Sequence, residues 1–184
     1  AVPNSTVIET TDAVMAGAIL RATKDRKGLT YIRLSRKNLP AVYEEGSTFE
    51  IGKGNLLRDG KDVTFIVAGL MVAEALRAAE TLEKEGISAA VIDMFTIKPL
   101  DEALTLEYAK KTGAIVTGEN GNVVGGLGAA VAVYLSETLP TPVIRTGVLD
   151  RFGQVGAQPF LQEEYGLTAA KLVENAKKAI ALKK

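Results

Sequence analysis

The 184-residue sequence contains no cysteine and no histidine. Without cysteine, neither a disulfide framework nor a thiolate metal site can form. Without histidine, the chain lacks the side chain that most often transfers protons near neutral pH. Ser-His-Asp triads, Cys-His pairs and histidine-ligated metals are therefore excluded as sites made by this chain alone.

An excess of charge of either sign is also missing, because 22 lysines and arginines balance 22 aspartates and glutamates. A balanced chain lacks the basic excess that displaces counterions from phosphates, so we expect no general nucleic-acid binding. No apolar run reaches the roughly 18 to 20 residues of a membrane span. The first residues (AVPN) resemble neither an initiator segment nor a signal peptide. We expect a cytoplasmic chain, processed or cut from a longer protein, with no membrane partner.

Residues 1–46 are predicted to be the tail of an α/β domain. A β-branched run at residues 6–8 is followed by Asp12, which can cap a helix with apolar residues at three- and four-residue spacing. A second strand is predicted at residues 29–34. Two strands and one helix are too few to bury both faces of a sheet, so this segment should present an open edge. The aperiodic connection at residues 37–48 indicates the domain boundary.

Residues 47–184 are predicted to be a complete α/β domain, because buried-type strands and amphipathic helices alternate along them. The dipeptide Asp59-Gly60 lies between residues 49–57 and the strand beginning at Val63, which predicts a hairpin and one antiparallel edge strand. The expected fold class is three-layer α/β/α. It has a mixed, mostly parallel sheet of about five strands with one antiparallel edge strand, and a partial second α/β domain precedes it. The strands are expected at residues 63–67, 89–94, 115–117 and 143–148, and the helices at 71–85, 99–111, 128–139, 158–165 and 168–182.

A glycine-rich run at residues 125–128 (GGLG) precedes a predicted helix, and helix starts attract anions. The run lacks the third glycine of a dinucleotide fingerprint. Close backbone packing is therefore favoured over nucleotide binding. Glu119 falls in the loop before the run, at a strand end where α/β proteins gather ligands. A lone glutamate there is more often solvated or caps backbone.

Charged residues follow other predicted strands. Asp93 and Lys98 flank a short segment for which a salt bridge or turn hydrogen bonds are favoured. Asp150 and Arg151 begin the loop DRFG, where a solvated turn is favoured over an arginine that reaches a partner subunit.

Ser35 and Arg36 end the strand of the first segment. The planar guanidinium of an arginine suits phosphate, and a neighbouring hydroxyl adds a donor. Because most arginines at strand ends are only solvated, the residues alone leave both interpretations open.

Several motifs, in the right order and spacing, resemble transketolases over nearly the whole chain. The end of the family's pyrimidine-binding domain is similar to residues 2–7 (VPNSTV), 11–14 (TDAV) and 32–40 (IRLSRKNLP). The family's C-terminal domain is similar to residues 93–101 (DMFTIKPLD), 125–128 (GGLG) and 150–153 (DRFG). The resemblance implies that residues 1–46 are the tail of the first domain and that residues 47–184 are the second.

The resemblance implies a parent enzyme that moves a two-carbon ketol unit between sugar phosphates, using thiamine diphosphate and magnesium. The family's cofactor motif, activating glutamate and catalytic histidines are not among these residues. This chain is therefore expected to have no catalytic, cofactor-binding or metal-binding residue and to be inactive alone. Its implied role is structural and dimer-supporting, in a homodimer completed by a missing N-terminal part or partner subunit.

One functional residue carries over by resemblance. The arginine of the family's Ser-Arg-x-Asn-Leu pattern binds the substrate phosphate and falls on Arg36, with Ser35 beside it. Many relatives have a histidine where this chain reads Asn120-Gly121. Related thiamine-diphosphate enzymes share the domain and stay as alternatives, namely deoxyxylulose phosphate synthase and the beta subunit of 2-oxoacid dehydrogenases. A non-enzymatic assembly module is a third.

Overall fold

The computed structural model describes residues 2–183. No helix in this range is long and apolar enough to cross a membrane. The elements in chain order are β1 (Thr6–Glu9), α1 (Ala13–Thr23), β2 (Thr30–Arg33), β3 (Asn55–Arg58), β4 (Val63–Val67), α2 (Met71–Lys84), β5 (Ala89–Asp93), β6 (Thr96–Lys98), α3 (Glu102–Thr112), β7 (Ile115–Asn122), α4 (Leu127–Thr138), β8 (Val143–Val148), α5 (Gln158–Glu164) and α6 (Ala169–Ala181).

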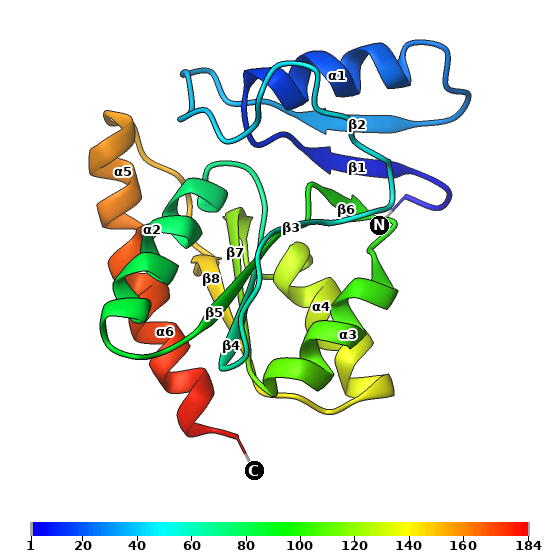
Figure 1. Cartoon of the computed structure of the whole chain (residues 1–184). Coiled ribbons are helices and arrows are strands. Elements are labelled where there is room, and N and C mark those ends of the chain that lie inside the picture. The colour runs from blue at the N-terminus through cyan, green and yellow to red at the C-terminus, as the bar shows by residue number, and fades with distance from the viewer. Residues whose placement is uncertain (1, 184) are drawn as a thin grey trace.

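The larger sheet has the strand order β3-β5-β4-β7-β8. Strands β5, β4, β7 and β8 are parallel, and β3 runs antiparallel to β5 at the edge. Helices α2 and α6 cover one face, and α3 and α4 cover the other (Figure 1). This confirms the predicted three-layer α/β/α class and the antiparallel edge strand.

Strand β4 shows why both faces are covered. Val63, Phe65 and Val67 pack into the core under α2 and α6, whereas Ile66 packs into the core under α3 and α4. Successive side chains of a strand point to opposite faces, so an unbroken apolar run needs cover on both. All five residues of β4 are buried accordingly.

The predicted hairpin is wrong, because β3 pairs with β5 and not with β4. The Asp59-Gly60 dipeptide instead crosses the start of β5, where the N–H of Asp62 donates to Ser88 O at 2.8 Å. A Cβ on Gly60 would lie 2.3 Å from the backbone carbon of Ala89. Glycine is required here because the two backbone segments approach closely. A tight turn requires glycine in the same dipeptide, so the sequence alone does not separate the two uses.

The smaller sheet has the order β2-β1-β6 and lies across one end of the larger sheet, with α1 on its outer side (Figure 1). β1 and β2 are parallel, while β6, which the sequence did not predict, is antiparallel to β1. Phe95, just before β6, is buried with Ile8, Met15 and Ile19 in a core of its own. Residues 95–98 thus join the first segment, and the division at residues 46 and 47 stays a prediction.

Candidate functional site

The carboxyl ends of parallel strands from both sheets face each other where the sheets meet. Glu9 and Arg33 end β1 and β2, Asp93 ends β5, and Glu119 lies near the end of β7. Ligands of open α/β sheets gather at this end of the strands. We therefore take this junction as the candidate functional site.

Glu9 and Arg33 form an ion pair at the centre of the junction. They are register partners on β1 and β2, and Arg33 Nη1 lies 3.3 Å from Glu9 Oε2. Glu9 also packs against Gly69, before α2, where a Cβ would lie 2.5 Å from Glu9 Oε1. Burial raises the pKa of Glu9 to about 7 although Arg33 opposes the rise, and Glu119 adds to it. This carboxyl group therefore titrates near neutral pH, and its charged form is the one that pairs with Arg33.

Glu119 caps α4 from within β7, not from the loop that the sequence predicted. Its Oε2 accepts from Leu127 N at 2.9 Å, and its Oε1 accepts from Gly128 N at 2.8 Å. A Cβ on Gly126 would lie 1.8 Å from Glu119 Oε2, so glycine makes room for the carboxylate. Burial raises the pKa of Glu119, against the lowering effect of these two N–H groups. The favoured role of the glycine run, close packing, is confirmed, because the chain's own carboxylate fills the helix N-terminus.

Asp93 links the two sheets through a buried hydrogen-bond network. Its Oδ2 accepts from Thr11 Oγ1 at 2.6 Å and from Tyr43 OH at 2.8 Å, and the Tyr43 oxygen accepts from Asn55 Nδ2 at 3.1 Å. Asp93 Oδ1 has no hydrogen-bond partner in the described part of the chain. Burial raises the pKa of Asp93 to about 7, against the lowering effect of Thr11 and Tyr43. The favoured interpretation, a salt bridge or turn hydrogen bonds, is wrong for Asp93, because its partners Thr11 and Tyr43 come from segments that are distant in sequence.

Ser35 and Arg36 lie on the surface beside this junction. Ser35 Oγ accepts from Lys37 N at 3.2 Å, which leaves its own proton free to donate. Arg36 is exposed and makes no hydrogen bond or ion pair with residues 2–183. Ser35 and Lys37 line a hollow of about 480 Å³ that reaches the start of α1 at Asp12. Ser35 lines a small hollow together with Glu9 and Arg33, whereas Arg36 lines neither this hollow nor the larger one.

Other candidates from the sequence are structural or lie elsewhere. Lys98 Nζ donates to Val2 O at 2.5 Å and forms no bridge to Asp93. A larger hollow, of about 800 Å³, lies between the ends of α3, α4 and α6, at Gly113, Leu139 and Leu182. None of the described residues that line it is acidic, and it stands apart from the strand ends.

Comparison with known proteins identifies this architecture. The family described as the transketolase C-terminal domain matches residues 52–172. The chain belongs to the transketolase family. It is 46% identical, over 95% of its length and 54% of the relative's, to the 6-deoxy-6-sulfo-D-fructose transketolase subunit SqwH of Clostridium sp. (strain MSTE9). It is 40% identical, over 86% of its length and 25% of the relative's, to 1-deoxy-D-xylulose-5-phosphate synthase of Heliobacterium modesticaldum.

A solved structure of a split-gene transketolase, described as an inactive β4 tetramer, is similar throughout. It superposes with a TM-score of 0.94 at 46% identity and covers 100% of this chain and 59% of its own. The chain thus spans 59% of that structure, 54% of the SqwH subunit and 25% of the synthase. The predicted family is confirmed. Deoxyxylulose phosphate synthase shares the domain, as expected from the sequence.

The transketolase family generally uses thiamine diphosphate. The described residues do not offer a group of side chains that could bind a metal ion. No three acidic or other metal-ligating side chains in residues 2–183 lie close enough together to hold an ion. The N-terminus of α4, the glycine-rich helix start, is filled by Glu119. That the chain has no cofactor-binding residue of its own stays a prediction.

The pairing of Glu9 with Arg33 was not predicted from the sequence. The available signal was positional, because an acidic and a basic residue end two parallel strands in the same register. Gly121 also gains a role: a Cβ there would lie 3.1 Å from Arg33 Nη1, so the small residue leaves room for the guanidinium.

The buried carboxyls predict that stability falls between about pH 5 and pH 8. Unfolded carboxyls ionise near their ordinary pKa of about 4, whereas Glu9 and Asp93 keep their protons until about pH 7 when folded. The folded state binds more protons within this window, so the free energy of unfolding drops as pH rises through it, by a total of about 2 to 5 kcal/mol. Urea unfolding at half-unit pH steps measures the slope.

Asp93→Asn should reduce this slope and leave the contribution of Glu9, because the amide stays neutral and its oxygen still accepts from Thr11 and Tyr43. The control is Glu174→Gln, since Lys171 and Lys178 lower the pKa of Glu174 to about 2, outside the window. A free energy of unfolding that stays level or rises from pH 5 to pH 8 would contradict the assignment.

Proposed function

We propose that this chain is the C-terminal part of a transketolase that transfers two-carbon ketol units between sugar phosphates. In this proposal the chain has a structural, dimer-supporting role in the enzyme and contributes one phosphate contact through Arg36. Catalysis relies on the rest of the enzyme. The similarity to the transketolase subunit SqwH, at 46% identity, supports ketol transfer between sugars, and the synthase reaction stays the alternative, supported by 40% identity to deoxyxylulose phosphate synthase. The cofactor, thiamine diphosphate with magnesium, is held by the rest of the enzyme.

The unpaired outer edge of β2 supports the proposal that this chain has a missing partner. No strand in residues 2–183 pairs with that edge, and Leu29, Tyr31 and Leu34 along it are all more than half exposed. An open strand edge with apolar side chains is a template for pairing. We propose that the rest of the enzyme, as upstream chain or separate subunit, extends the small sheet here. Because the similar split-gene structure is a β4 tetramer, we also propose that copies of this chain associate.

The observation that carries the substrate proposal is the free guanidinium of Arg36 beside Ser35 and Lys37. Arg36 has no acidic partner in the described residues, so its charge is available to an anion from solution. Lys37 adds a second positive charge, and the hydroxyl of Ser35 can donate. A terminal phosphate of a sugar fits this donor set.

Arg36→Ala in the complete enzyme should lower kcat/KM for phosphorylated sugars by about 10- to 100-fold. Loss of a charge-assisted hydrogen bond costs about 1.5 to 3 kcal/mol, and the contact lies far from the reacting carbons. The effect should appear mainly in KM, because the contact is equal in the ground and transition states. Arg36→Lys should recover part of the loss, since an ammonium lacks the planar fork.

A sugar without phosphate is the internal control, because it never makes the contact and its kinetics should stay unchanged. Arg21→Ala removes another exposed arginine, on α1, and should affect neither class of sugar. Equal losses for both sugars, or a matching fall in melting temperature, would make Arg36 a structural residue and remove the support for this proposal.

A further inference from the structure

Arg33 is the last anchored residue before an exposed stretch of the chain. It ends β2, and its carbonyl oxygen accepts from Thr10 N at 3.2 Å, just beyond the end of β1. Residues 34–38, which follow, are all exposed, and Arg36 lies in the middle of them. The place of Arg36 is therefore set by how firmly the chain is held at Arg33.

The side chain of Arg33 is held from both sheets. On the side of the smaller sheet, the buried carboxylate of Glu9 pairs with its Nη1 atom at 3.3 Å. On the side of the larger sheet lies Gly121, where a Cβ would be 3.1 Å from Arg33 Nη1 and 3.5 Å from Glu119 Oε2. Burial raises the pKa of Glu119, and the charge of Arg33 is one of the influences that oppose the rise. The guanidinium thus lies between one carboxyl group of each sheet.

Glu9, the ion-pair partner, is itself fixed by the larger domain. Gly69 lies before α2, and a Cβ there would be 2.5 Å from Glu9 Oε1. The small hollow at the pair has a volume of about 50 Å³, and its lining comes from both parts of the chain: Glu9, Arg33 and Ser35 from the first segment, Leu70 and Asn120 from the larger domain. Such a hollow has room for only a few water molecules, so the pair has little space in which to move.

We propose that Arg33 is a positioning residue: held between Glu9 and the larger domain, it fixes the segment that presents Arg36 to the substrate phosphate. The inference rests on the proposed phosphate contact of Arg36, and it gives the larger domain a part in that contact. A segment that is ordered before binding loses less conformational freedom when the phosphate arrives, so the contact is stronger. Arg33 acts through Arg36 and does not itself touch the sugar.

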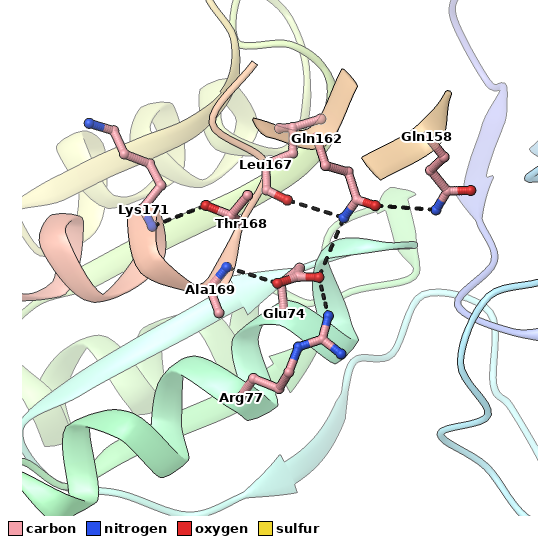
Figure 2. A network of polar contacts seen from close by, with 8 residues as sticks. All are labelled: Glu74, Arg77, Gln158, Gln162, Leu167, Thr168, Ala169 and Lys171. Carbon is pink, nitrogen blue, oxygen red and sulfur yellow. Dashed lines mark hydrogen bonds and ion pairs between the residues drawn. The ribbon is translucent and has the colours of Figure 1, made fainter. Parts of the chain in front are cut away.

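A second pair of the same kind lies within the larger domain, around Glu74 (Figure 2). There Arg77 is half-exposed and Glu74 is buried, as are the arginine and the glutamate at the sheet junction. Glu74 also accepts from Ala169 N at 2.8 Å and from Gln162 Nε2 at 3.4 Å. This network joins α2 to α5 and to the start of α6, so the loss of Arg77 should leave Arg36 in place.

Steady-state kinetics of the complete enzyme test the proposal, with a phosphorylated sugar and with the same sugar lacking its phosphate. Arg33→Ala should raise KM for the phosphorylated sugar about 3- to 10-fold, because binding must then order the segment. The value of kcat, and both constants for the sugar without phosphate, should stay unchanged. Arg33→Lys should recover part of the loss, since an ammonium still pairs with Glu9 but lacks the planar fork. It carries the same test if the alanine variant does not fold.

Two further variants separate positioning from a general loss of stability. Gly121→Val, in the larger domain, should raise KM for the phosphorylated sugar in the same way, because its side chain takes the room of the guanidinium. Arg77→Ala is the matched control, and it should change KM for neither sugar. An effect of Arg77→Ala as large as that of Arg33→Ala overturns the proposal, and Gly121→Val without effect overturns the part given to the larger domain.

A double-mutant cycle with Arg36→Ala shows whether Arg33 acts through Arg36. Once Arg36 is removed, Arg33→Ala should have no further effect on KM. If Arg33→Ala leaves KM unchanged, raises it equally for both sugars, or costs the same with and without Arg36, the positioning role is overturned while the phosphate contact stands. If Arg36→Ala itself leaves the phosphorylated sugar unaffected, the proposed phosphate contact is wrong and this inference falls with it.

Discussion

Gly126→Ala should lower the free energy of unfolding by about 3 to 5 kcal/mol. The added Cβ would lie 1.8 Å from Glu119 Oε2, so the carboxylate must leave its place at the start of α4. The side chain then loses its hydrogen bonds from Leu127 N and Gly128 N. Hydrogen bonds to a charged group are worth about 1.5 to 3 kcal/mol each, and the N–H groups of the helix are left without their acceptor.

Urea unfolding at constant pH measures this loss, and Gly153→Ala is the matched control. A Cβ on Gly153 would have no atom of residues 2–183 within 4 Å, so this substitution should change stability by less than about 0.5 kcal/mol. A double-mutant cycle isolates the clash: once Glu119→Ala has removed the carboxylate, Gly126→Ala should be nearly neutral. If Gly126→Ala remains costly in that background, the glycine has a role other than housing Glu119.

The regular elements of the larger domain follow from local patterns, which is why the sequence predicts them well. The strand at β8 agrees with its predicted limits, and α2, α4 and α6 differ by a residue or so at their ends. Helices reveal themselves by apolar spacing and capping residues, and buried strands by short apolar runs. Alternation then fixes the layers and the mostly parallel sheet.

The strand pairings of β3 and β6 depend on contacts that are distant in sequence. Asp59-Gly60 has the signature of a tight turn, but the chain uses Gly60 to pass close to Ala89, and β3 pairs one strand further out. Residues 96–98 form a strand that is too short to show a strand pattern in the sequence. They pair with β1 because that strand offers a free edge. Local signals do not decide between such partners.

The candidate site was predicted only in part for the same reason. Glu119, Asp93 and Arg36 each attract notice as charged residues near strand ends, but the partners of Glu119 and Asp93 come from other elements. Thr11 reaches Asp93 across 82 residues of sequence, and Glu9 meets Arg33 only when β1 and β2 align. The role of Arg36 rests on resemblance and stays a proposal.

The 184-residue chain alone should show no ketol transfer, and the rest of the enzyme should restore it. The described residues offer no metal donor set, and the sequence contains no histidine for proton transfer. The rate of ketol transfer should therefore rise above background only when the rest of the enzyme is present. It can be joined upstream or added as a separate subunit. The control is the same mixture made with Arg36→Ala, which should regain activity toward sugars without phosphate but only weakly toward phosphorylated ones.

The most direct measurement of the central claim follows ketol transfer between a ketose phosphate and an aldose phosphate, with thiamine diphosphate and magnesium present. Three samples are compared at equal concentration: this chain, the rest of the enzyme, and the two combined. The account predicts activity in the combined sample alone and no saturable binding of the cofactor by this chain in isothermal titration. Turnover by the isolated chain, cofactor binding by it at a one-to-one ratio, or a combined sample that binds cofactor yet transfers no ketol unit would contradict it.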